Sequence, residues 1–164
     1  AESERMFRNL QEGTFRFQTV EEGDNLAVHI ANECPNPQEA IYISELLSNA
    51  VEHGNAGLTY EEKTELIAFN QLASEVARRL ALPENMHKFV TVKLTRTTEY
   101  FSILVEDMGK GFNFKKYLQF EDVRIFDNHG RGIAILNALY PVQFLEAGNK
   151  VLVQIPLGGP AMSQ

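Results

Sequence analysis

The chain of 164 residues contains very little cysteine and no long apolar run. Cys34 is its single cysteine, so an internal disulfide or a zinc site built from several thiolates is excluded. The longest apolar stretches, Phe101 to Val105 and Ile133 to Leu136, fall far short of the roughly 18 residues that a membrane-spanning helix needs. The sequence therefore predicts a protein that has no disulfides and does not cross a membrane.

Positive charge is also scarce, because 15 Lys and Arg stand against 22 Asp and Glu, giving a formal net charge of −7. Nucleic acids are bound mainly by clustered Lys and Arg, so we expect no nucleic-acid partner. A small phosphate ligand is compatible with this charge when Mg²⁺ and backbone N–H groups supply the positive field. Residues 1–11 are charged and lack the apolar core of a secretion signal, which predicts a cytoplasmic location.

The rest of the composition is typical of one globular domain. Apolar residues make up 44% of the chain, and its length suffices for one hydrophobic core but not for two. We predict an N-terminal extension at 1–13, a single domain at 14–158 and a C-terminal tail at 159–164. Because the chain begins at Ala1 and not at Met, we expect that it was excised from a longer protein.

The hydrophobic pattern predicts helices early in the chain and strands in the middle and at the end. This order favours an α+β fold in which helices cover one face of a mixed sheet, a two-layer sandwich. The predicted elements are a strand at 14–20, helices at 26–33, 38–54 and 59–82, strands at 89–97 and 100–106, a helix at 133–139, and strands at 142–146 and 151–156.

The segment from Glu45 to Asn55, Glu-Leu-Leu-Ser-Asn-Ala-Val-Glu-His-Gly-Asn, is the first candidate site. At about 100° per residue, one side of a helix carries its polar side chains, Glu45, Asn49, Glu52 and His53. The oxygen of Asn49 can coordinate Mg²⁺, while Glu45 can accept a proton from an attacking hydroxyl. The alternative is an ordinary polar stripe on a surface helix.

Two glycine-containing segments follow. Asp107 comes directly after an apolar strand, so its carboxylate can accept a hydrogen bond from an exocyclic amine, while Gly109 and Gly111 let the backbone approach a flat ligand. Further along, Gly130-Arg131-Gly132 precedes a helix, whose unpaired N–H groups can bind phosphate. The alternatives are a simple turn after the strand and a loop in which glycine serves close packing.

In this order, Glu-x-x-x-Asn-x-x-x-His, Asp-x-Gly-x-Gly and Gly-x-Gly resemble the N, G1 and G2 boxes of the gyrase, chaperone, histidine-kinase and mismatch-repair (GHKL) ATPases. The resemblance covers about Phe15 to Leu157 and implies the Bergerat-type ATP-binding sandwich of this histidine-kinase-like ATPase superfamily. The first segment is most similar to that of the anti-sigma-factor serine kinases. Residues 58–88 form a helical insertion, and 113–129 correspond to the ATP lid.

The resemblance also implies roles for individual residues. Glu45 would be the general base, Asn49 the Mg²⁺ ligand and Asp107 the partner of the adenine amine. The glycines Gly109 and Gly111 would shape the base pocket. The remaining residues would lie at or near the phosphates, namely Gly130, Arg131, Gly132 and, close by, His53.

The function implied is that of a regulatory serine protein kinase. Such an enzyme binds Mg-ATP and transfers the γ-phosphate to a Ser of a small antagonist protein, with a sigma factor as a further partner and a homodimer as the expected assembly. The insertion resembles those of ATPase domains attached to bacterial response regulators or serine phosphatases, which supports excision from a larger signalling protein. The alternative is a switch module that binds nucleotide or a protein partner without transferring phosphate.

Overall fold

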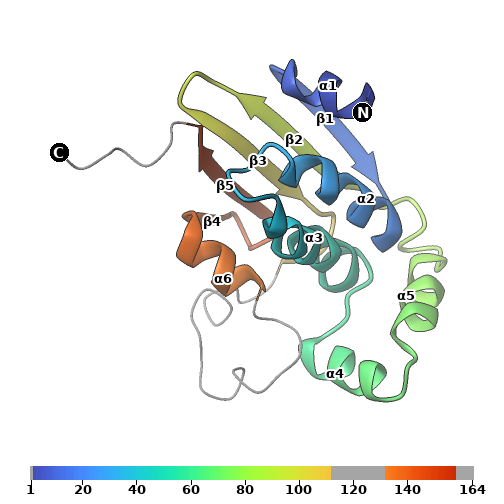
Figure 1. The fold of residues 1–164 in the computed structure, drawn as a ribbon. Coiled ribbons are helices and arrows are strands. Elements are labelled where there is room, and N and C mark those ends of the chain that lie inside the picture. Colours follow the sequence, from blue (N-terminus) through green and yellow to red (C-terminus); the bar gives the residue numbers. More distant parts are fainter. Residues whose placement is uncertain (1, 112–131, 158–164) are drawn as a thin grey trace.

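The computed structural model describes residues 2–111 and 132–157, which form helices and one sheet (Figure 1). The elements are α1 (Glu2–Arg8), β1 (Glu12–Phe17), α2 (Val20–Ala31), a short 3₁₀ turn η1 (Pro37–Glu39), α3 (Ala40–Asn49), a π-helical turn η2 (Ala50–Asn55), α4 (Tyr60–Ala68), α5 (Leu72–Leu80), β2 (Val90–Arg96), β3 (Tyr100–Glu106), α6 (Gly132–Leu139), β4 (Val142–Leu145) and β5 (Lys150–Pro156).

The five strands form an open sheet in the order β1-β2-β3-β5-β4. Each neighbouring pair in this sheet is antiparallel, so the prediction of a mixed sheet was wrong. A parallel pair needs a helical crossover between neighbouring strands. Here α6 leads to β4 at the edge, and β5 then returns antiparallel between β4 and β3.

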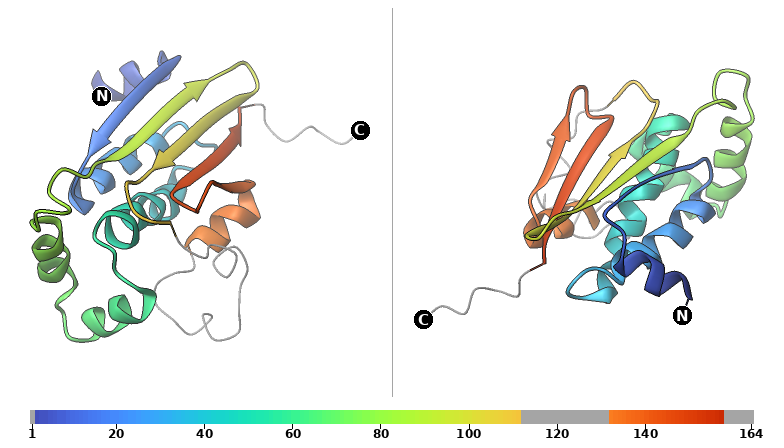
Figure 2. Two further views of the ribbon diagram at one scale, coloured as in Figure 1. Left: turned by 180° about the vertical axis from the view of Figure 1, so that it is seen from behind. Right: turned by 90° about the horizontal axis from the view of Figure 1, so that it is seen from above.

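The helices cover one face of the sheet. Buried and more exposed residues alternate along β2, β3 and β5, so one face of each strand faces a common core. Figure 1 shows α2 and α3 in front of the sheet, and the view from behind in Figure 2 brings the strands forward. The largest fully buried side chains come from both layers and are Phe101, Ile30, Ile43, Leu47, Leu94, Ile103, Leu136, Ile155, Val51, Val90, Val92 and Val105.

Helix α2 begins at Val20, six residues before the predicted start at 26. The Glu-Glu-Gly-Asp segment, interpreted as a turn, is the first turn of this helix. Thr19 accepts a hydrogen bond from the N–H of Glu22 (3.2 Å), and the Glu22 carboxylate accepts from the N–H groups of Gln18 and Thr19. This capping box fixes the start of the helix. The preceding strand therefore ends at Phe17, not at Val20.

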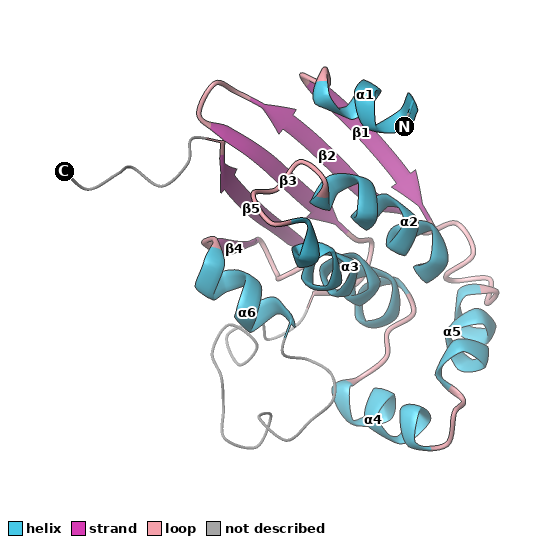
Figure 3. Ribbon diagram, viewed as in Figure 1, coloured by secondary structure: helices cyan, strands magenta, loops and turns pink. Residues whose placement is uncertain are grey.

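The insertion forms two helices, α4 and α5, where one helix at 59–82 was predicted. Thr59 caps α4 as the sequence indicated, with Glu62 completing a second capping box. The break lies at Asn70, whose φ of 54° is incompatible with a right-handed helix. Figure 3 shows that the two helices lie beside the sheet and do not cover it.

In the part of the chain that the structure describes, none of the helices combines the length and apolar character required to span a membrane.

Candidate functional site

A cavity of about 550 Å³ lies where the end of α3, the turn η2 and the end of β3 meet. Its volume is within the roughly 300–1,000 Å³ of typical small-molecule sites. Apolar side chains of several elements line it together with polar groups. Its apolar side chains include Leu46, Ala50, Val105, Ile133, Phe144 and Val151. A partly apolar ligand with a few polar groups suits such a lining.

Five of the predicted site residues line this cavity: Asn49, His53, Asp107, Gly109 and Gly111. They come from two segments far apart in the sequence, which the fold brings to one place.

The other described candidates, Glu45 and Gly132, contact each other. A Cβ added to Gly132 would lie 2.0 Å from Oε2 of Glu45, so a larger residue at 132 would require the Glu45 side chain to move. Within 2–111 and 132–157, the cavity lining includes neither of them, and α6 contributes Ile133 instead. Gly130 and Arg131, with the predicted lid at 113–129, lie outside the described residues.

The first predicted segment ends in a π-helical turn, not in a continuous α-helix. The N–H of Ala56 donates to the carbonyl of Val51 five residues earlier (2.8 Å). The extra residue in this turn rotates the side chains after Asn49 away from their α-helical directions, and π turns of this kind are frequent at functional sites.

Glu52 shows the result of this rotation. It was predicted to share a polar face with Glu45 and Asn49, but it is 5% exposed and pairs with Lys63 of α4. The Nζ of Lys63 lies 2.5 Å from Oε2 of Glu52, and both side chains are buried. Glu52 therefore holds the insertion against the π turn, and the prediction that it belongs to a polar face with Glu45 and Asn49 was wrong.

Asp107 is held by the turn that follows β3. The N–H of Gly109 donates to its Oδ1 (2.7 Å), and the carboxyl group lies against Gly54. A Cβ at Gly54 would lie 2.3 Å from Cγ of Asp107. The two segments therefore approach each other so closely that a side chain at position 54 would clash with Asp107. Burial raises the pKa of Asp107 from 3.8 to about 6, against the opposing effect of the Gly109 N–H.

The setting of His53 disfavours the charged form of its imidazole. A carbonyl oxygen only accepts hydrogen bonds, so Nδ1 of His53 must donate to the carbonyl of Leu58, 2.6 Å away. Burial lowers the pKa of His53 below 6.5. The proton on Nδ1 leaves Nε2 with a lone pair, so His53 lines the cavity as an uncharged acceptor.

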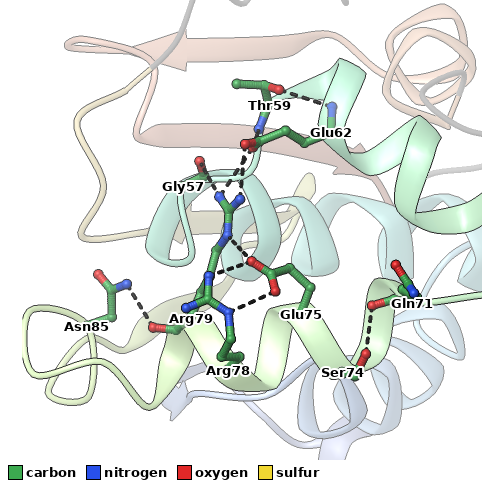
Figure 4. Close-up of polar contacts among 9 residues, drawn as sticks. All are labelled: Gly57, Thr59, Glu62, Gln71, Ser74, Glu75, Arg78, Arg79 and Asn85. Carbon is green, nitrogen blue, oxygen red and sulfur yellow. Dashed lines mark hydrogen bonds and ion pairs between the residues drawn. The ribbon is translucent and has the colours of Figure 1, made fainter.

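The insertion also forms part of the cavity wall, which the sequence did not predict. Leu58, Thr59 and Lys88 of the insertion line the cavity. Arg79 of α5 donates to the carbonyl of Gly57 (3.2 Å) and pairs with Glu62, the capping residue of α4 (Figure 4). The arm α4–α5 is thereby tied to the edge of the cavity. Sequence spacing gave no signal for this contact, because Arg79 and Gly57 are joined only through the tertiary structure.

Replacing Gly111 by Ala should lower the free energy of unfolding by roughly 2–4 kcal/mol. Its φ is +80°, and an added Cβ would lie 2.0 Å from the carbonyl oxygen of Ala147. Gly57→Ala is the matched control, because φ there is also positive (+67°) but no described atom lies within 4 Å of the added Cβ. We expect the control to cost only about 1 kcal/mol in urea denaturation. Equal losses for the two variants would contradict a close approach at Gly111.

Metal-binding groups are sparse in the described part of the chain, which holds no cluster of three or more His, Cys, Asp or Glu side chains suited to a metal ion. Mg²⁺ does not require such a cluster, because it commonly keeps several waters and binds through one or two protein ligands and substrate phosphates. The amide oxygen of Asn49 in the cavity fits this mode.

Comparison with known proteins adds no family assignment, since no family model matches the chain and no curated protein matches it either.

Proposed function

We propose that the chain is a Mg-ATP-binding serine protein kinase of the anti-sigma-factor type with a Bergerat-type fold. The observation that carries the proposal is that Asn49 and His53 share one cavity with Asp107, Gly109 and Gly111. A buried carboxylate in a cavity that is also lined by apolar side chains suits a purine whose amine donates to it. The order of the three sequence segments and the helices over one face of an open sheet also support this function.

Each residue has a distinct role in this proposal. Asp107 accepts a hydrogen bond from the adenine amine, and the neutral His53 contacts the nucleotide without adding charge. Asn49 would hold the Mg²⁺ that accompanies ATP, and the ion would supply neutralisation of charge on the phosphates. Glu45, one helical turn before Asn49, withdraws the proton of the acceptor Ser. Gly130, Arg131 and Gly132 contact the phosphates. The rate enhancement would then come mainly from positioning the reacting groups and from stabilising the charge on the phosphates.

A cytoplasmic location, a small antagonist protein as substrate, a sigma factor as further partner and a homodimer belong to the same proposal. The charged residues 1–11 support the location. The resemblance of the Glu45 to Asn55 segment to the anti-sigma-factor kinases supports the substrate, the further partner and the homodimer. Labelled ATP incubated with candidate antagonist proteins tests the transfer itself. Phosphoserine on one of them is the expected product.

One observation favours a second function. Glu45 packs against Gly132 and is not among the described residues that line the cavity. A module that binds ATP and switches its affinity for a protein partner, without phosphate transfer, requires no general base. Heat of Mg-ATP binding in calorimetry without phosphate transfer to any candidate would favour this switch over the kinase.

Replacing Asp107 by Asn tests nucleotide binding directly. We expect ATP affinity to fall roughly 10- to 100-fold, because the adenine amine loses a charged acceptor. Stability should change in the opposite direction. The native state holds the Asp107 proton more tightly than the unfolded chain does, so the ionised carboxylate lowers stability at pH 7, and this penalty fades as the pH falls from about 6 toward 3.8.

The Asn variant keeps an acceptor for the Gly109 N–H and removes the buried charge. Its free energy of unfolding at pH 7 should therefore rise by about 1–2 kcal/mol. Calorimetric titration with Mg-ATP and urea denaturation measure the two effects. Unchanged ATP affinity would remove Asp107 from the nucleotide site, and a loss of stability would contradict the burial of a costly charge.

A further inference from the structure

Two hydrogen-bonding groups in the cavity wall have no partner among the residues that the structure describes. Asn55 is 1% exposed, and its buried Nδ2 meets no acceptor among the described residues. The buried Oδ1 of Asn149 likewise meets no donor in the described part of the chain. Both residues line the cavity that holds Asp107. A buried polar group without a partner costs about 1–3 kcal/mol, so a ligand that satisfies both groups is favoured.

The hydrogen bonds of Asn55 settle which end of its amide is the unpaired one. The N–H of Met108 needs an acceptor and donates to Oδ1 of Asn55 (2.7 Å). The opposite end of the amide is therefore the NH₂ group, which can only donate. What is missing at this position is an acceptor, and neither a second amine nor an apolar group would provide one.

Asn55 and Asp107 are held by the same short turn. Met108 donates to Asn55, Gly109 donates to Asp107, and the N–H of Asp107 donates to the carbonyl of Asn149 (3.0 Å). These hydrogen bonds tie Asn55, Asp107 and Asn149, which all line the cavity, to one turn of the backbone. Adenine presents the complementary pair, because its exocyclic amine is a donor and a ring nitrogen acceptor lies next to it.

We propose that Asn55 is a base-reading residue, whose Nδ2 donates to the adenine ring nitrogen beside the amine that Asp107 accepts. This inference rests on the proposed ATP binding and adds to it the residue that recognises the ring. The ring nitrogen is N1 or N7, since each of them flanks the amine.

Two ATP analogues test this contact in the unmodified chain. In 1-deaza-ATP and 7-deaza-ATP a C–H replaces N1 or N7, which leaves the donor of Asn55 unsatisfied if it reads that atom. We expect one of the two analogues to bind roughly 5- to 100-fold more weakly than ATP in calorimetric titration. The other analogue should bind about as tightly as ATP. Equal affinities for ATP and both analogues would overturn the assignment.

Variants then connect the loss to Asn55. In Asn55→Ala and in the isosteric Asn55→Asp, ATP should bind more weakly, but the difference between ATP and the sensitive analogue should disappear. Asn85→Ala is the matched control, because Asn85 lines the same cavity while its Nδ2 already donates to the carbonyl of Arg79 (2.9 Å). In this control the difference in affinity between ATP and the sensitive analogue should persist. If ATP still binds more tightly than the sensitive analogue in both Asn55 variants, the proposal is overturned.

The two proposals fail in different ways. If no adenine nucleotide binds to the unmodified chain, the proposed function fails together with this contact. If ATP binds and Asp107→Asn weakens it, while neither analogue differs from ATP, only the role of Asn55 is lost. The analogue titrations use the unmodified chain, so they decide the question even if an Asn55 variant does not fold.

Discussion

Replacing Glu45 by Gln should slow loss of the γ-phosphate from ATP by roughly 10²- to 10⁴-fold, the usual contribution of a positioned general base. The amide has nearly the shape of the carboxylate, so it should keep the contact with Gly132 while losing the ability to accept a proton. The Kd for Mg-ATP should stay within about twofold, because a base that acts on the attacking hydroxyl contributes to the transition state only.

Single-turnover assays with γ-labelled ATP, with and without candidate antagonist proteins, measure this effect on transfer to Ser and to water. Glu61→Gln is the matched control, because Glu61 also lines the cavity but lies in the first turn of α4. We expect its transfer rate to change little. Full transfer by Glu45→Gln would show that the base is another group. A parallel loss of ATP affinity would indicate that Glu45 serves the architecture of the site.

Replacing Lys63 by Met should lower the free energy of unfolding by about 3–5 kcal/mol. The Met side chain fills the space of the Lys stem, but it leaves Glu52 with an uncompensated charge, 5% exposed. The loss is large because a buried ion that loses its partner retains its full desolvation penalty. Urea denaturation at pH 7 measures the change.

Two further variants distinguish the loss of stability caused by an unpaired buried charge from the loss caused by removing any Lys. Lys93 pairs with Glu12 on the surface at 2.9 Å, with both side chains well exposed, so Lys93→Met should cost less than about 1 kcal/mol. Combining Lys63→Met with Glu52→Leu removes both charges and should restore most of the stability. If the double variant were no more stable than Lys63→Met alone, the loss would not come from an unpaired charge.

Local patterns predicted the strands well. Tyr100–Glu106 forms β3 as predicted, and β2, β4 and β5 differ from their predicted ranges by a single residue at one or both ends. Strand β1 starts two residues and ends three residues before its predicted bounds. Apolar and polar residues alternate along a strand when one face of the strand meets the core and the other does not. The strands of this sheet meet that condition, so their sequence pattern was easy to read. The start of α2 was missed although Thr19 and Glu22 form its capping box, because the Glu-Glu-Gly-Asp segment was interpreted as a turn.

The strand directions and the course of the first segment were not evident from the sequence. A helix between two strands is compatible with either a parallel or an antiparallel sheet. Here, among the described strands, β4 lies at the edge and pairs only with β5, so all neighbouring strands are antiparallel. The π turn adds one residue to a helical turn, so a count at 100° per residue placed Glu52 on the wrong face.

The candidate site was predictable in part, because Asn49 and Asp107 lie in recognisable segments and do share a cavity. The unpaired Nδ2 of Asn55 was not predictable, since it depends on where the Met108 N–H lies after folding. The ties from Arg79 to Gly57 and from Lys63 to Glu52 were also missed, because both join the insertion to the rest of the domain through space.

The guanidinium of Arg79 has a mechanical consequence. It bonds to Glu75 within its own helix, to the Glu62 that caps α4, and to the backbone at Gly57 (Figure 4). A force applied to either helix of the insertion is therefore carried to the cavity wall through one rigid, planar group. Arginine suits this connecting role better than lysine, because its planar guanidinium donates several hydrogen bonds in fixed directions.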